Sequence, residues 1–235
     1  MISTRTARLI SILPEKLVRR IADKVLDGYM KRNANIIIEG LDNVKNAKKP
    51  VIYVCNHLSN ADALVLKRVL QKYDSPTFVA GVKLSQNVIT NLALGTCKTT
   101  NIKPNSPDKD GLKRIIELVK GGESIVIFPE GTRSREKKLI EAKKGVLLIA
   151  KMAKAQIIPI GMVGTEILYP INESGDMSAE EFHKADVHVK IGKPFELPKK
   201  AEDEDRKSYE ERAIRHIMYN IAELLPEKYR GIYSK

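Results

Sequence analysis

Short apolar runs alternate with helical stretches along most of this chain, and this alternation restricts its fold more than any other feature. Three runs are mostly apolar and rich in β-branched residues: Val51–Cys55, Ser124–Phe128 and Ile157–Val163. Runs of this kind are typical of strands that are buried on both faces of a sheet. The further predicted strands are Ile36–Glu39, Thr77–Ala80 and Ala185–Ile191, and the predicted helices are Ala61–Tyr73, Lys109–Lys120, Gly145–Ala153 and Ser208–Leu225. We therefore predict an α/β fold with a mixed, largely parallel sheet flanked by helices.

The first 33 residues differ from the rest. Residues 1–32 hold eight Lys or Arg and three acids, a net charge of +5. Apolar doublets recur in steps of four and predict an amphipathic helix: Leu17–Val18, Ile21–Ala22, Val25–Leu26 and Tyr29–Met30. A basic helix of this kind can lie in a membrane interface, but an apolar stripe packs equally well on a protein body. We thus divide the chain into an N-terminal helical segment, residues 1–33, and one domain, residues 34–235.

The positive charge of the chain favours an acidic partner, although lysines also coat many ordinary solvated faces. It carries 41 Lys and Arg against 29 Asp and Glu, a net charge of +12. Anionic lipid, an acidic carrier protein and nucleic acid are all candidates, but no aromatic-basic pattern favours nucleic acid. No run approaches the roughly 18–20 apolar residues of a spanning helix, and no secretory signal is recognisable near Met1. The two cysteines, Cys55 and Cys97, predict neither a disulfide framework nor a metal site, which favours a reducing, cytoplasmic setting.

Two of the predicted strands run directly into polar loops. Val51–Cys55 leads to a loop with His57 and Asp62, and Ser124–Phe128 leads to Pro-Glu-Gly-Thr-Arg-Ser, residues 129–134. If the two strands are parallel, both loops meet at one edge of the sheet, where α/β proteins bind ligands.

The spacing of His57 and Asp62 requires a turn between them. Five positions along a helix rotate by about 500°, so the two side chains would not share a helix face. Ser59, three residues before Asp62, resembles a capping box that would place Asp62 in the first helical turn, folded back towards His57. The plainer alternative is that Asp62 only caps its helix and that His57 is an incidental loop residue.

Taken in order, these motifs resemble the PlsC-like lysophospholipid acyltransferase family. His57 to Asp62 matches the family's His-x4-Asp motif, and residues 128–134 match its Phe-Pro-Glu-Gly-Thr-Arg-Ser motif without a change. Residues 142–146 and 157–160 are similar to its later motifs, so the resemblance covers residues 36–195. In the acceptor-binding region, Lys103 stands where the family usually has arginine, and the usual Ala-Lys pair is missing, with a lysine only at Lys83.

The resemblance implies that residues 34–235 form a glycerolipid acyltransferase domain. Its reaction would move a fatty acyl group from a thioester of acyl carrier protein or coenzyme A to the hydroxyl of lysophosphatidic acid, giving phosphatidic acid. The thioester would be a co-substrate, and no cofactor would be needed. His57 would be the general base and Asp62 its partner. The implied substrate-binding residues are Lys83, Lys103, Glu130, Gly131, Thr132 and Arg133, with no metal ligand. The enzyme would work peripherally at the cytoplasmic face of the membrane.

Several alternatives remain open at this point. The acceptor could be glycerol 3-phosphate or another lysolipid, or water in a thioester hydrolase. A basic lipid-binding protein without catalysis would need no base. For Arg133, the ordinary alternative is a surface salt bridge.

Overall fold

Seven strands form a single sheet at the centre of the molecule. The computed structural model describes residues 14–81, 95–103, 106–172 and 180–234. Within them the strand order is β1-β7-β6-β2-β5-β3-β4. The strands are β1 (Ala34–Glu39), β2 (Val51–Cys55), β3 (Thr77–Gly81), β4 (Thr99–Ile102), β5 (Ile125–Ile127), β6 (Gln156–Val163) and β7 (Ala185–Ile191).

The direction of the strands confirms the predicted mixed, largely parallel sheet. Strands β6, β2, β5, β3 and β4 all run parallel to one another. The pair β7 and β1 is parallel within itself, but β7 runs antiparallel to β6. The carboxyl ends of five neighbouring strands therefore lie along one edge of the sheet.

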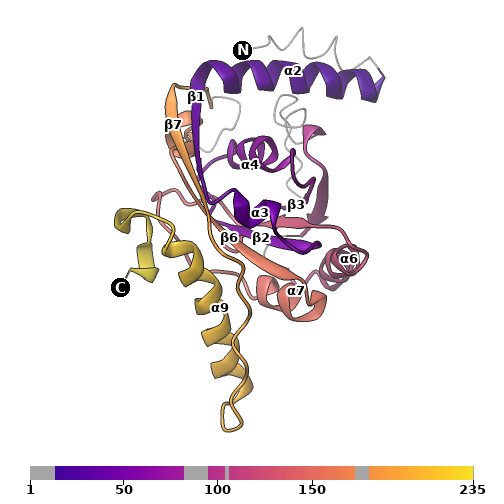
Figure 1. The fold of residues 1–235 in the computed structure, drawn as a ribbon, viewed down its shortest axis with the longest axis vertical. Coiled ribbons are helices and arrows are strands. Elements are labelled where there is room, and N and C mark those ends of the chain that lie inside the picture. The colour runs from indigo at the N-terminus through magenta and orange to yellow at the C-terminus, as the bar shows by residue number, and fades with distance from the viewer. Residues whose placement is uncertain (1–13, 82–94, 104–105, 173–179, 235) are drawn as a thin grey trace.

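Helices cover both faces of this sheet (Figure 1). They are α2 (Glu15–Asn33), α3 (Asp42–Lys45), α4 (Asp62–Leu70), α6 (Lys109–Lys120), α7 (Gly145–Ala153), α8 (Thr165–Leu168) and α9 (Arg206–Ala222), followed by two 3₁₀ turns, η2 (Glu227–Tyr229) and η3 (Gly231–Tyr233).

The central strand β2 shows how one sequence supplies two cores. Successive side chains of a strand point to opposite faces. Val51, Tyr53 and Cys55 pack in the cluster that holds α4, whereas Ile52 and Val54 pack in the cluster of α6, α7 and α9. All five side chains are buried. A strand buried on both faces needs a continuous apolar run, which is the pattern that the sequence shows.

Most predicted elements are confirmed, and the differences are local. Strand β4 was not predicted, because Thr99–Ile102 is short and mostly polar and lies at the edge of the sheet. The last long helix begins at Arg206, two residues earlier than predicted, because the Asp205 side chain accepts hydrogen bonds from the N–H groups of Lys207 and Ser208.

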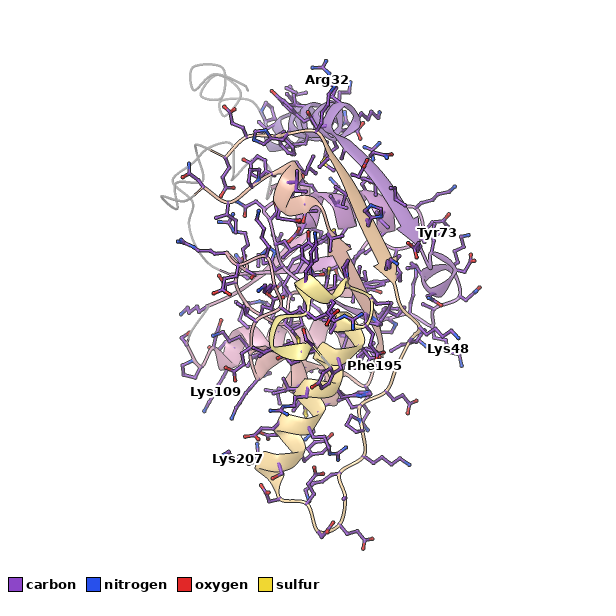
Figure 2. The ribbon with its side chains drawn as sticks, turned by 90° about the vertical axis from the view of Figure 1, so that its left-hand side faces the viewer. Arg32, Lys48, Tyr73, Lys109, Phe195 and Lys207 are labelled. Carbon is purple, nitrogen blue, oxygen red and sulfur yellow. The ribbon has the colours of Figure 1, made fainter. Side chains whose placement is uncertain are left out.

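Helix α2 packs on the body of the domain beside α4. Its residues Ala22 and Met30 are buried. Asp23 pairs with Lys67 of α4 at 2.5 Å, and Asp27 pairs with Arg68 of the same helix. The cations of α2 whose side chains are described, Arg20, Lys24, Lys31 and Arg32, are instead exposed, and Figure 2 shows Arg32 at the opposite end of the molecule from Lys207. Residues 1–13 lie outside the described part of the chain.

Among the described helices, none combines the length and the apolar character needed to cross a membrane. The prediction of an amphipathic helix before residue 34 is confirmed by α2, and the buried residues Ala22 and Met30 mark the face that packs on the domain. A role at a membrane interface stays a prediction.

Candidate active site

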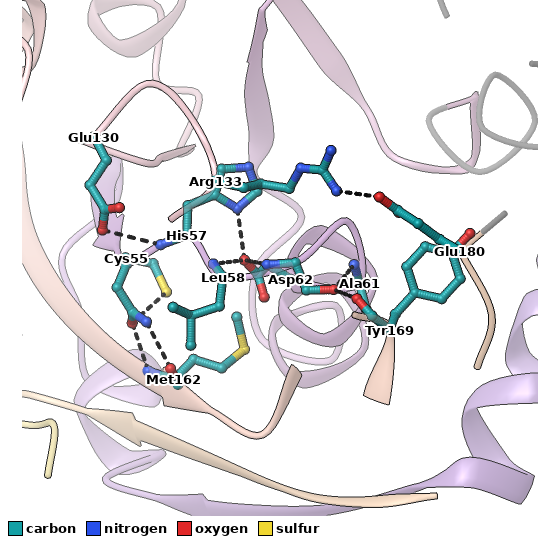
Figure 3. A network of polar contacts seen from close by, with 12 residues as sticks. Cys55, His57, Leu58, Ala61, Asp62, Glu130, Arg133, Met162, Tyr169 and Glu180 are labelled. Carbon is teal, nitrogen blue, oxygen red and sulfur yellow. Dashed lines mark hydrogen bonds and ion pairs between the residues drawn. The ribbon is translucent and has the colours of Figure 1, made fainter. Parts of the chain in front are cut away.

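The polar loops that follow β2 and β5 lie side by side at the carboxyl edge of the sheet. The two strands are direct parallel neighbours, so their loops leave the sheet together. Two hydrogen bonds then join the loops: the Ser134 N–H donates to the His57 carbonyl at 2.8 Å, and the His57 N–H donates to Glu130 Oε1 at 3.3 Å. The backbone of His57 is therefore held on both sides by the second loop, and Figure 3 shows the bond to Glu130.

The His57 ring is hydrogen-bonded to the carboxylate of Asp62. His57 Nδ1 lies 2.7 Å from Asp62 Oδ2. The Asp62 side chain is fully buried, whereas 21 % of the His57 side chain is exposed. A carboxylate accepts only, so Nδ1 carries the proton and Nε2 keeps its lone pair in the neutral ring. No hydrogen-bond partner of Nε2 occurs within the described ranges.

Backbone groups hold the carboxylate of Asp62 in place. Its Oδ2 atom also accepts hydrogen bonds from the N–H groups of Leu58 at 2.7 Å and Ser59 at 2.9 Å. The bond to Ser59 is half of the expected capping box, with Asp62 in the first turn of α4. The other half of a capping box would be a bond from the Asp62 N–H to Ser59 Oγ. Here Ser59 Oγ instead accepts from the Ala61 N–H and donates to the Tyr169 carbonyl at 2.6 Å. Asp62 thus holds the turn that precedes its helix and orients His57 at the same time.

Packing fixes the plane of the His57 ring. The ring stacks on Phe128, with ring centroids 4.1 Å apart and planes inclined by 17°. One face of the imidazole is thus covered by the first residue of the second motif. This contact restricts rotation of the ring.

Asn56, immediately before His57, anchors the first loop to β6. Its side chain is buried, its Nδ2 donates to the Met162 carbonyl, and its Oδ1 accepts from the Met162 N–H, both at 2.8 Å. The amide therefore extends the hydrogen-bond ladder of the sheet by one step beyond the end of β2. It sets the point where the chain turns away towards His57.

Glu130 lies in the interior and does not face the open edge. Its side chain is buried, and Oε1 accepts the His57 N–H, while Oε2 has no hydrogen-bond partner among the described residues. Burial raises the pKa of Glu130 to about 9; the bond from the His57 N–H opposes this rise, and the nearby Asp62 charge adds to it. Glu130 is therefore protonated at neutral pH and supports the backbone beneath His57.

Arg133 is paired with an acid that sequence reasoning missed. Its Nη1 atom lies 2.9 Å from Oε1 of Glu180, whose side chain is fully buried. Oε2 of Glu180 accepts a hydrogen bond from Asn60 Nδ2 at 2.7 Å. Glu180 is 47 residues from Arg133 along the chain and belongs to no motif, so only the fold brings them together.

The other residues predicted to bind substrate are spread along the same edge. Gly131 adopts φ +68° and its N–H donates to the Phe128 carbonyl at 3.0 Å, so that group is used within a turn. Thr132 is exposed, and its N–H has no backbone acceptor in the part of the chain described here.

Lys103 follows β4, two strands away from β5, and is exposed. With neighbouring strands about 4.8 Å apart, roughly 10 Å separates β4 from β5, and the structure does not bring Lys103 into contact with the two loops. Lys83 lies outside the described residues. The described residues also contain no group of three side chains suited to a metal ion.

Comparison with known proteins decides the family. A family model described as Acyltransferase matches residues 35–163, which is more than half of the chain and includes both loops. The chain belongs to the acyltransferase family. Both motif segments recognised in the sequence, with His57, Asp62, Glu130 and Arg133, lie inside the matched region, and Glu180 lies outside it.

Named relatives of this acyltransferase share one description. The chain is 33 % identical over 160 residues to the chloroplastic 1-acyl-sn-glycerol-3-phosphate acyltransferase BAT2 of Brassica napus, covering 67 % of this chain and 44 % of that protein. It is 28 % identical over 138 residues to the 1-acyl-sn-glycerol-3-phosphate acyltransferase of Bacillus subtilis, covering 57 % of this chain and 68 % of that protein. The chain thus spans less than half of the plant relative.

A solved structure supports the fold. The crystal structure of the 1-acyl-sn-glycerophosphate acyltransferase PlsC from Thermotoga maritima matches 86 % of this chain and 79 % of its own, with a TM-score of 0.58 and 25 % identity. The match extends beyond the family model, since it covers most of the chain.

Proposed function

We propose that this acyltransferase moves a fatty acyl group from a thioester to the free hydroxyl of lysophosphatidic acid and so forms phosphatidic acid. The observation that carries the proposal is the His57–Asp62 pair, in which Nδ1 is bonded to a buried carboxylate and Nε2 is left with its lone pair. The names of the relatives, 1-acyl-sn-glycerol-3-phosphate acyltransferases, support the choice of acceptor. A protein that only bound lipid would need no such pair.

The proposed mechanism is direct transfer. Nε2 of His57 takes the proton of the acceptor hydroxyl while its oxygen attacks the thioester carbonyl carbon. The tetrahedral intermediate then collapses, the C–S bond breaks, and the imidazolium returns its proton to the leaving sulfur. Asp62 holds the required tautomer and stabilises the positive ring between these two steps.

Two further groups are proposed to bind the reacting lipid. The N–H of Thr132, an exposed residue, is our candidate donor to the oxyanion of the intermediate, because it has no backbone acceptor among the described residues, whereas the neighbouring Gly131 N–H is already used. Arg133 is our candidate for the acceptor phosphate, since a guanidinium can bind phosphate in a bidentate fashion. Lys103 would add charge at a greater distance.

The acyl donor is proposed to be acyl carrier protein or acyl-coenzyme A, both of which are anionic. The segment that follows the second motif, residues 135–144, carries five exposed cations: Arg135, Lys137, Lys138, Lys143 and Lys144. Within the described ranges none of the five forms a salt bridge. Their charge beside the catalytic loops suits an anionic carrier.

We further propose that the N-terminal segment, residues 1–33, binds an anionic membrane surface. The exposed cations Arg20, Lys24 and Arg32 support this, since each basic residue near such a surface contributes about 1 kcal/mol. The triple change of these residues to glutamine leaves Ala22 and Met30 in place and is expected to weaken binding to phosphatidylglycerol vesicles at least tenfold. Unchanged binding would assign the membrane contact to another surface.

The function is tested by assaying the protein with both donors and a panel of acceptors. Release of the thiol carrier is measured with lysophosphatidic acid, glycerol 3-phosphate, lysophosphatidylglycerol or no acceptor. We expect fastest turnover with lysophosphatidic acid and formation of phosphatidic acid. A faster reaction with another acceptor would identify that molecule as the substrate, and release of free fatty acid without any acceptor would indicate a thioester hydrolase. Lipid binding without turnover would indicate a lipid-binding protein without catalysis.

A further inference from the structure

The buried carboxylate of Glu180 connects the two halves of the site. It accepts a hydrogen bond from Arg133 Nη1 at 2.9 Å (Figure 3). It accepts a second hydrogen bond from Asn60 Nδ2 at 2.7 Å. Asn60 lies between His57 and Asp62 in the first loop, and Arg133 lies in the second loop. A single side chain therefore fixes Arg133 relative to the catalytic histidine, although it comes from a third segment of the chain.

The segment that carries Glu180 is itself held firmly. Phe182 packs against Tyr169 with ring centroids 4.6 Å apart and stacks on Tyr29 of α2 at 5.5 Å. The Tyr169 carbonyl accepts the Ser59 hydroxyl of the first loop at 2.6 Å. These contacts leave the carboxylate little freedom to move, so it is a fixed support and not a mobile latch.

Glu180 uses only part of the guanidinium. Arg133 has five N–H donors in a planar fork, and one of its two terminal nitrogens is bonded to Glu180. The Arg133 side chain is 19 % exposed, and no other partner of it occurs in the described residues. The remaining donors are thus oriented in advance for an anion that binds at the sheet edge beside His57.

We propose that Glu180 is a positioning residue, which holds Arg133 in the orientation that binds the phosphomonoester of the acceptor. This inference rests on the proposed function, because it takes the acceptor to be a phosphorylated lipid. It makes a prediction opposite to that of simple electrostatics. Removal of a nearby negative charge would by itself strengthen phosphate binding, whereas loss of orientation weakens it.

The test compares two soluble short-chain probes, 1-hexanoylglycerol 3-phosphate and 1-hexanoylglycerol, which differ only in the phosphate. The variant Glu180→Gln removes the charge and keeps the shape, and Glu181→Gln, an exposed neighbour, is the matched control. We expect Glu180→Gln to raise both Kd and KM of the phosphorylated probe roughly 10-fold or more, with kcat changed less than about threefold. The neutral probe and the control variant should show no change.

A mutant cycle with Arg133 adds a second criterion. In an Arg133→Ala background, Glu180→Gln should have no further effect on the phosphorylated probe, because the group that it positions is gone. The proposal would be overturned if Glu180→Gln left the Kd of the phosphorylated probe unchanged or made it tighter, or if it weakened the binding of both probes equally. It would also be overturned if Glu180→Gln raised this Kd just as much in the Arg133→Ala background. If Glu180→Gln does not fold, Asn60→Ser removes only the second anchor and must still raise the Kd of the phosphorylated probe several-fold.

Calorimetric Kd values separate this inference from the proposed function. A wild-type protein that binds the phosphorylated probe but does not acylate it would refute the function alone. A wild-type protein that acylates the probe and whose Glu180→Gln variant binds it normally would refute the role of Glu180 alone.

Discussion

Replacement of Glu130 with glutamine should stabilise this acyltransferase at neutral pH. Burial raises the pKa of Glu130 from its ordinary value of 4.5 to about 9, so the folded state keeps a proton that the unfolded state loses. Between these two pH values the unfolded state binds fewer protons, and the free energy of unfolding falls as pH rises. The contribution of the protonated carboxyl is complete below pH 4.5 and is lost progressively as pH rises through 9.

The magnitude follows from the two pKa values. At 1.36 kcal/mol for each pH unit, ionisation of the unfolded state between pH 4.5 and 7 lowers the stability by about 3 kcal/mol. Glutamine does not titrate, and its carbonyl can still accept the His57 N–H that Glu130 Oε1 accepts now. For a chain of this size, about 3 kcal/mol corresponds to a rise in Tm of roughly 6–12 °C.

The assay is thermal unfolding of the wild type and Glu130→Gln from pH 5 to 9, with the exposed Glu136→Gln as the matched control. The Tm difference should grow with pH in the Glu130 variant and stay near zero in the control. Because the support of the His57 backbone is retained, kcat should remain within about tenfold of the wild type. A Tm that is unchanged or lower at pH 7 would show that Glu130 is ionised in the folded protein.

Three other changes test separate parts of the site. Asp62→Asn should lower kcat by roughly 10³–10⁴-fold in steady-state assays, since the amide no longer selects the reactive tautomer of His57; a loss below tenfold would contradict this. Gly131→Ala places a side chain at φ +68° and should lower the unfolding free energy by about 1 kcal/mol in urea titrations; no loss would show that the turn relaxes. Arg133→Ala leaves the Glu180 carboxylate buried without its charge partner and should cost about 3 kcal/mol by the same method; adding Glu180→Gln should restore part of it, and no recovery would contradict the pairing.

The sequence was sufficient for the contact between His57 and Asp62. The two residues are close in the chain, and the serine before the helix indicates that the carboxylate turns back. The second loop could be placed beside the first because both follow apolar runs typical of parallel buried strands, and the structure confirms that β2 and β5 are neighbours. Local spacing and strand topology therefore carried this part of the prediction.

The environment of Glu130 and Arg133 could not be predicted in the same way. A motif gives the residue type but not the direction of its side chain, and Glu130 points into the interior, where burial keeps it protonated. The partner of Arg133 comes from a segment 47 residues further on, without periodicity or motif. Strand β4 was missed for a related reason, because an edge strand of polar residues is stabilised by its neighbour and not by its own pattern.

If His57 is the general base of acyl transfer, turnover must fall steeply in a His57→Ala variant. Thiol release from the acyl donor is followed with lysophosphatidic acid as acceptor, after thermal unfolding has shown that the variant is folded. We expect kcat to fall at least roughly 10³-fold with the acceptor KM nearly unchanged, because the ring acts on the proton in the transition state. A kcat within a few-fold of the wild type would contradict the role of His57 as the general base.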